Sequence, residues 1–161
     1  MGGMIAVEIA RKYAPICIIL ISSVSSSKQL PPYYRWAGRL KLHKLVPVGL
    51  FLKASLLKRF FTTESREDKQ MLKPMIRRAD PYFIKWSMNA VLKWEAEEVP
   101  SEVIHIHGTR DEVLPFRFTK PTHVIQNGGH LMVLNRADQI SEILCQIICD
   151  GNDEKQGTSI N

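Results

Sequence analysis

Two kinds of apolar pattern alternate along the chain, and they predict an α/β fold. Continuous runs rich in β-branched residues occur at Ile16–Ser22, Val103–His107 and Thr122–Ile125. Such runs are typical of parallel strands that are buried on both faces. Helical periodicity at residues 3–13 and at Leu131–Cys149 places helices before the first strand and after the last. We therefore expect about three parallel strands flanked by helices.

Residues 3–13 carry apolar side chains on nearly every side, which predicts a helix that is buried all round and ends at Pro15. In residues 31–98 the β-type runs disappear and an all-helical insertion is expected. Its predicted helices are Tyr33–Leu45, Val48–Phe61, Glu64–Arg78 and Pro81–Glu97. The expected organisation is a start of the α/β core at 1–30, a helical cap at 31–98, the rest of the core at 99–150 and a disordered tail at 151–161.

Charge and cysteine content change this picture little. The net charge is +6, and basic residues are enriched around the helical region. They allow a second hypothesis, a non-catalytic interaction domain that binds an anionic partner or membrane surface, although we expect a solvated basic face and no nucleic acid. Cys17, Cys145 and Cys149 have no second ligand pair at metal-binding spacing, so we expect buried thiols in a cytoplasmic protein. A signal peptide spanning residues 1 to about 27 is a third possibility.

Two residues that follow consecutive predicted strands carry the candidate chemistry. Asp111 follows the strand that ends at Gly108, and a carboxylate there can fix the tautomer of a histidine. His130 follows Gly128-Gly129, where the backbone can bend tightly or take positive φ, and it can act as a general base. The alternatives without catalysis are that Asp111 is a turn residue that caps the next helix and that His130 only begins a helix.

His105 and His107 alternate with apolar residues, so both side chains point to one face of the sheet. A metal site with two histidines is conceivable, but packing beneath helices is the better interpretation. We expect no metal and no cofactor.

The motifs in this order resemble the α/β-hydrolase fold. His107-Gly108-Thr109-Arg110-Asp111 is similar to the acid loop of the family, and Gly128-Gly129-His130 is similar to its histidine turn. Gly2-Gly3-Met4 resembles the end of the family's nucleophile elbow, and residues 31–98 resemble its cap. The resemblance implies a Ser–Asp–His triad that hydrolyses an ester, thioester or similar acyl substrate, with Asp111 orienting His130. Aromatic residues of the cap such as Trp36, Phe51, Trp86 and Trp94 could line an acyl pocket, although core packing is expected for most of them.

The chain departs from the family at the nucleophile, because no Gly-x-Ser-x-Gly occurs in it. In the family pattern the serine falls immediately before Met1. We therefore expect a partial fold, truncated just after the elbow, with negligible turnover by this chain alone. We also expect the strand Ile16–Ser22 to be an open apolar edge through which copies of the chain can associate.

Overall fold

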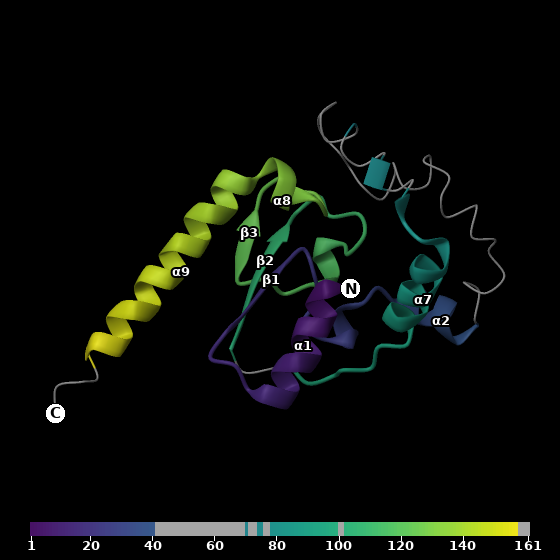
Figure 1. The fold of residues 1–161 in the computed structure, drawn as a ribbon, viewed down its shortest axis with the longest axis horizontal. Coiled ribbons are helices and arrows are strands. Elements are labelled where there is room, and N and C mark those ends of the chain that lie inside the picture. The colour runs from purple at the N-terminus through teal and green to yellow at the C-terminus, as the bar shows by residue number, and fades with distance from the viewer. Residues whose placement is uncertain (41–69, 71–73, 76–77, 100–101, 158–161) are drawn as a thin grey trace.

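A three-stranded parallel sheet forms the centre of the computed structural model, which describes residues 1–40, 70, 74–75, 78–99 and 102–157 (Figure 1). The strands are β1 (Ile18–Ile21), β2 (Val103–Gly108) and β3 (His123–Ile125), in the order β1-β2-β3. Both neighbouring pairs are parallel, so the carboxyl ends of all the strands meet at one edge of the sheet. This arrangement confirms the α/β prediction and gathers the loops after β2 and β3 together.

Helix α1 (Gly2–Tyr13) covers one face of the sheet. It buries Met4, Val7 and Ala10, and the last two pack with Ile18 and Leu20 of β1. The prediction that this helix is buried all round is wrong, since its Ile5 and Ile9 are 48% and 52% exposed. A sheet of this width contacts only one side of the helix, and an apolar composition does not supply a partner for the other side.

The opposite face is covered by α8 (Met132–Asn135) and α9 (Ala137–Gly157), which replace the single predicted helix. Met132 and Ile140 pack there with Ile106 and Ile125. The backbone is helical to Gly157, so α9 runs into residues 151–157, while the boundary and nature of the predicted tail stay a prediction. This polar stretch has no proline, and each of its two glycines, Gly151 and Gly157, costs a helix only about 1 kcal/mol.

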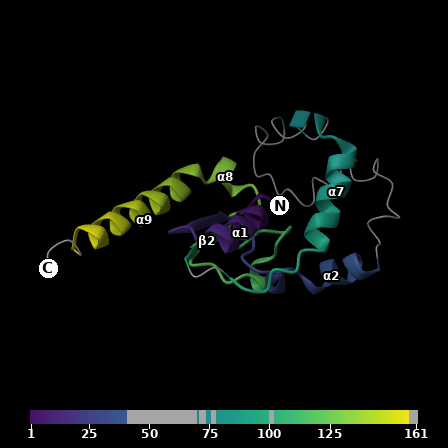
Figure 2. The ribbon, with the colours of Figure 1, turned by 60° about the horizontal axis from the view of Figure 1, so that its bottom comes forward.

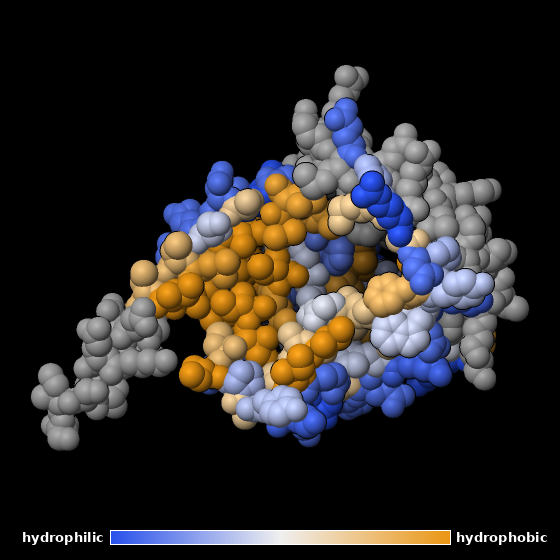
Figure 3. All heavy atoms as spheres, viewed as in Figure 1, coloured by the Kyte–Doolittle hydropathy of each residue, from blue (hydrophilic) through white to orange (hydrophobic). Residues whose placement is uncertain are grey.

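Strand β1 is an edge of the sheet and is only partly covered. Ile18 and Leu20 are buried beneath α1, but Ile19 on the other face is 37% exposed. The expectation that this strand is covered on both faces is therefore wrong. On the face that carries Ile19, α8 and α9 cover β3 and β2 but reach β1 only at Ile21. Figure 3 shows a continuous apolar surface over the sheet and the adjoining side of α9.

The association of copies through β1 stays a prediction, and one substitution tests it. We expect Ile19→Lys to lower self-association, because a charge on an apolar edge opposes pairing. Sedimentation velocity across a concentration series measures the effect. Val133→Lys introduces the same charge at a side chain that is 52% exposed on α8 and serves as the control. A wild-type chain that stays monomeric at every concentration would contradict the prediction.

The described part of residues 31–98 contains α2 (Pro32–Arg39) and α7 (Pro81–Leu92), which lie beside α1 and away from α9 (Figure 2), while residues 93–98 are not helical although the predicted helix ran to Glu97. The predicted helix Val48–Phe61 lies outside the described residues, as does most of Glu64–Arg78, and the domain boundaries stay predictions. Asp80 caps α7, because its Oδ1 accepts a hydrogen bond from the Tyr82 amide at 2.8 Å. A short 3₁₀ helix, η1 (Ser27–Gln29), links β1 to this region, and another, η2 (Phe116–Phe118), precedes β3.

The cysteines differ from expectation. Cys17, Cys145 and Cys149 are all free and exposed, so the prediction of buried thiols is wrong. Cys17 precedes the first residue of β1, and the other two lie on α9 beyond the part that packs on the sheet. Among the helices of the described residues, none is long and apolar enough to cross a bilayer.

Candidate active site

Asp111 lies in the loop after β2, and its two oxygens have separate partners. Oδ1 accepts hydrogen bonds from the backbone amides of Val113 at 2.9 Å and Leu114 at 2.8 Å. Oδ2 lies 2.8 Å from Nδ1 of His130. The side chain is fully buried. Asp111 therefore stabilises its own turn and also contacts a histidine, so the two interpretations of this residue in the sequence analysis do not exclude each other.

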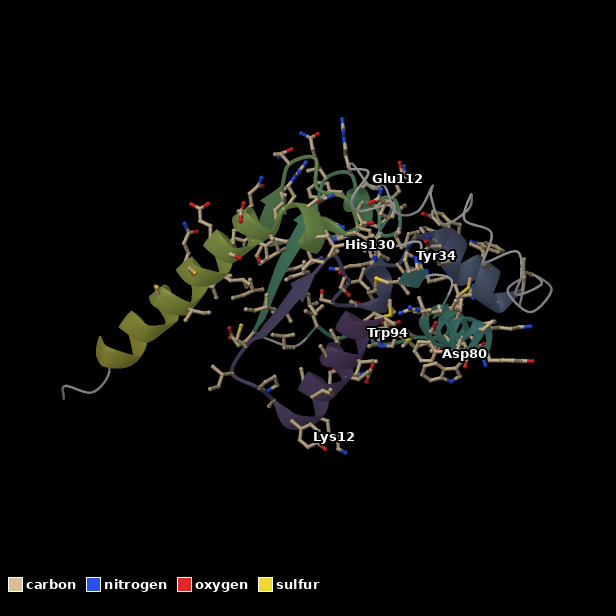
Figure 4. The ribbon with its side chains drawn as sticks, turned by 45° about the horizontal axis from the view of Figure 1, so that its top comes forward. Lys12, Tyr34, Asp80, Trp94, Glu112 and His130 are labelled. Carbon is tan, nitrogen blue, oxygen red and sulfur yellow. The ribbon has the colours of Figure 1, made fainter. Side chains whose placement is uncertain are left out.

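His130 lies in the turn between β3 and α8, and its side chain is 22% exposed. Because a carboxylate can only accept a hydrogen bond, Nδ1 of His130 carries the hydrogen and Nε2 is the basic nitrogen. Figure 4 shows His130 near the N-terminal end of α1. Of the two alternatives given for Gly128-Gly129, a tight bend or a positive φ, the second does not occur, because the positive φ of this turn is at Asn127, where φ is 58°.

The glycines serve instead to bring the two loops together. A Cβ on Gly108 would lie 2.1 Å from the carbonyl oxygen of Gly128, so the backbones touch at this point. Hydrogen bonds join the loops on either side of this contact. The amide of Thr109 donates to the Ile125 carbonyl at 3.1 Å, and that of Arg110 donates to the Gly128 carbonyl at 2.9 Å. The contact holds Asp111 and His130 in register.

We expect Gly108→Ala to destabilise the chain by about 2–3 kcal/mol, because the new methyl group meets backbone that cannot move without breaking these bonds. The midpoint of urea unfolding measures the change. Gly2→Ala is a matched control, since a Cβ there meets nothing within 4 Å. Equal stability of the two variants would show that the loops are not held by this contact.

Two buried histidines of β2 lie next to the Asp111 loop. His105 and His107 are 2% and 0% exposed, and Nε2 of His105 lies 3.1 Å from Nδ1 of His107. Nε2 of His107 lies 2.8 Å from the Leu114 carbonyl oxygen and 3.5 Å from Oδ2 of Asp111. This confirms that both rings point to one face of the sheet. Burial lowers the pKa of both imidazoles, that of His105 to about 4 with a further contribution from His107.

Tyr34, which the sequence analysis missed, ties α2 to the acid loop. Its hydroxyl donates to the Val113 carbonyl at 2.9 Å. Burial raises the pKa of Tyr34 to about 12, and the charges of Tyr33 and Asp111 add to this effect. The hydroxyl therefore remains a donor at neutral pH. No local sequence signal distinguishes Tyr34 from the neighbouring Tyr33.

The first turn of α1 adjoins the acid loop and an apolar cavity. Met4 packs with Leu114 in one buried cluster. A cavity of about 430 Å³ runs between α1 and α7, with Trp86 and Trp94 in its wall. The expectation of core packing is wrong for Trp86 and Trp36, which are 57% and 63% exposed. Phe51 lies outside the described residues. Nε1 of Trp94 donates to Glu8 at 2.7 Å.

The serines after β1 are held in the fold and differ from exposed nucleophiles. Ser23 is buried, and Gly3 of α1 packs so closely on it that a Cβ on Gly3 would lie 2.1 Å from the Ser23 Oγ. Ser26 donates to the carbonyls of Ala96 and Glu97 at 3.2 Å and 3.0 Å. Within the part of the chain that the structure describes, no group of three or more His, Cys, Asp or Glu residues could hold a metal ion.

The three parallel strands, with helices on both faces of the sheet, are those of part of an α/β-hydrolase fold, and solved structures agree. The chain is similar to a thermophilic esterase from Thermogutta terrifontis, with a TM-score of 0.65 and 16% identity over 92% of this chain and 62% of that one. It is also similar to MGS-M2, an α/β hydrolase from a deep-sea metagenome, with a TM-score of 0.58 and 15% identity over 91% and 62% of the two chains. For the bromoperoxidase BpoC of Mycobacterium tuberculosis the TM-score is 0.53, with 15% identity over 91% and 63%.

The protein therefore has part of the α/β-hydrolase fold, as the motifs predicted. It spans less than two thirds of the length of each of these structures. No protein-family model matches the chain, and no curated protein matches it by sequence. The likeness thus rests on three-dimensional structure and on the placement of Asp111 and His130.

Proposed function

We propose that this chain provides the acid and the general base of a serine hydrolase that acts on an ester, thioester or similar acyl substrate. The observation that carries the proposal is the 2.8 Å contact between Asp111 and His130 on the ends of adjacent parallel strands. A buried carboxylate with both oxygens occupied fixes Nδ1–H and leaves Nε2 as the base. The chain has no Gly-x-Ser-x-Gly, so the nucleophile comes from polypeptide outside these residues.

In the proposed reaction the serine Oγ attacks the acyl carbon while Nε2 of His130 takes its proton. The imidazolium, stabilised by Asp111, then returns the proton to the leaving alcohol or thiol. A water molecule then attacks the acyl-serine and loses a proton to Nε2, which passes it to the serine Oγ as the acyl–Oγ bond breaks and the carboxylic acid leaves. The apolar cavity between α1 and α7 suits an acyl chain, because Trp86, Val91 and Trp94 form part of its wall.

The proposal makes this chain inactive by itself, and a two-part experiment tests it. The intact mass of the natural product shows whether it exceeds 18.4 kDa, and a fluorophosphonate probe shows whether it holds a reactive serine. We expect a larger product that reacts with the probe and hydrolyses p-nitrophenyl butyrate, and we expect His130→Ala to abolish hydrolysis. His123→Ala is the matched control, since His123 contacts Thr122 and not Asp111.

Ester hydrolysis by the 18.4 kDa chain alone would contradict the proposal, as would a larger active product in which His130→Ala has no effect. A larger product that neither reacts with the probe nor hydrolyses esters would also overturn it. In that case the hypothesis of a non-catalytic interaction domain gains weight. Most of the basic helical segments on which that hypothesis depends lie outside the described residues.

A further inference from the structure

The inference concerns the pair of buried histidines on β2, which the proposed triad does not use. His105 and His107 follow the i, i+2 spacing of a strand, so both lie on the sheet face that α1 covers. Their rings meet edge to face, with centroids 5.0 Å apart. Imidazoles bury less apolar surface than the aliphatic residues around them, so packing alone does not explain two of them in contact.

The hydrogen bonds determine the tautomers of both rings. A carbonyl oxygen can only accept, so Nε2 of His107 carries hydrogen and donates to the Leu114 carbonyl at 2.8 Å. In a neutral ring Nδ1 of His107 is then an acceptor, and Nε2 of His105 must donate to it at 3.1 Å. That leaves Nδ1 of His105 without hydrogen; the Ser23 backbone lies within reach of the ring, but Nδ1 forms no hydrogen bond of acceptable geometry with a described residue.

This chain of donors ends on Leu114, the residue whose amide holds the acid. Leu114 accepts from His107 through its carbonyl, while its amide donates to Oδ1 of Asp111 at 2.8 Å. The same Nε2–H of His107 lies 3.5 Å from Oδ2, the oxygen that His130 contacts. Movement of His107 would therefore displace both oxygens of Asp111. Burial also keeps both rings neutral, so they place no positive charge beside the His130 contact.

We propose that His105 and His107 are positioning residues that anchor the acid loop to β2 and hold the Asp111 carboxylate toward His130. This inference deepens the proposed function and rests on it for its catalytic meaning. The geometric part concerns only this chain and can be measured without a nucleophile. His107 acts directly on the loop, and His105 acts by fixing the ring orientation of His107.

Nitrogen-15 NMR of the histidine-labelled full chain tests the geometry. In the wild-type chain at pH 7 we expect His105 and His107 as neutral Nε2–H tautomers and His130 as the Nδ1–H tautomer. In His107→Leu we expect the Nδ1 proton of His130 to exchange with water about tenfold faster, as expected when a hydrogen bond of ordinary strength weakens. His107→Gln keeps a donor near the Nε2 position and should restore slow exchange. His123→Gln is the control and should change nothing.

An Nδ1–H tautomer or a charged ring at His107 in the wild-type chain would overturn the proposal, and this measurement needs no variant to fold. Unchanged exchange at His130 in a folded His107→Leu chain would overturn it as well. Failure of the proposed function has a different signature. In that case the tautomers and exchange rates are as expected, but the larger natural product neither reacts with the serine probe nor hydrolyses esters.

Discussion

Replacing Asp111 by asparagine is expected to lower kcat about 10⁴-fold in the hydrolase assembled with its nucleophile, while KM changes little. The asparagine oxygen can still accept from the amides of Val113 and Leu114, so the loop keeps its turn. Its amide group then faces Nδ1 of His130, where the carboxylate oxygen lies at 2.8 Å. Two donors cannot bond each other, so the imidazole takes the wrong tautomer.

Steady-state hydrolysis of p-nitrophenyl butyrate measures this effect, and Glu112→Gln provides the matched control. Glu112 is an exposed carboxylate next to Asp111, so it separates loss of local charge from loss of the specific contact. We expect Glu112→Gln to retain nearly full activity. A less than tenfold loss in Asp111→Asn would show that the 2.8 Å contact does not support catalysis.

The second large effect is a loss of stability in mild acid. Burial holds the pKa of His105 at about 4 in the folded chain, below its ordinary 6.5, and lowers that of His107 as well. His107 and Asp111 face His105, and Asp111 and His130 face His107. Between pH 6.5 and 4 the unfolded chain therefore binds more protons than the folded chain. Unfolding becomes easier as the pH falls through this window, by on the order of 3 kcal/mol for His105.

Urea unfolding at pH 7, 6, 5 and 4 measures the predicted slope. His105→Phe removes the titrating group and keeps a ring of similar size, so we expect a flatter dependence on pH. His123→Phe replaces a histidine that is not buried and should leave the slope unchanged. Equal slopes in the wild type and in His105→Phe would mean that acid destabilisation originates elsewhere.

Most of the fold could be predicted from sequence because the signals are local. β-branched runs predicted the strands, and glycines after the second and third of them marked the two loops. Coverage was harder to predict, because burial depends on what packs on each face. Ile5, Ile9 and Ile19 are exposed although each of them has a buried neighbour in sequence.

The two main residues of the site could be predicted from the sequence, but most of the contacts that hold them could not. Asp111 and His130 stand at the ends of consecutive strands, and parallel strands bring such ends together. Their 2.8 Å contact agrees with that prediction, while the catalytic roles await the experiments above. The link from His105 through His107 to Leu114 depends on ring rotamers and carbonyl direction, which no spacing reveals. The contact between Gly108 and Gly128 likewise depends on how closely two turns approach.

The backbone contact between Gly108 and Gly128 also bears on folding order. The two loops that it joins are separated by a short length of chain, and Asp111 and His130 are only 19 positions apart. Closing so short a loop costs little entropy compared with pairing β1 to β2 across residues 22–102. The acid–histidine unit can therefore assemble early, and it can persist when β1 separates from the sheet. Amides within residues 103–130 should then exchange with solvent together, and more slowly than those of β1.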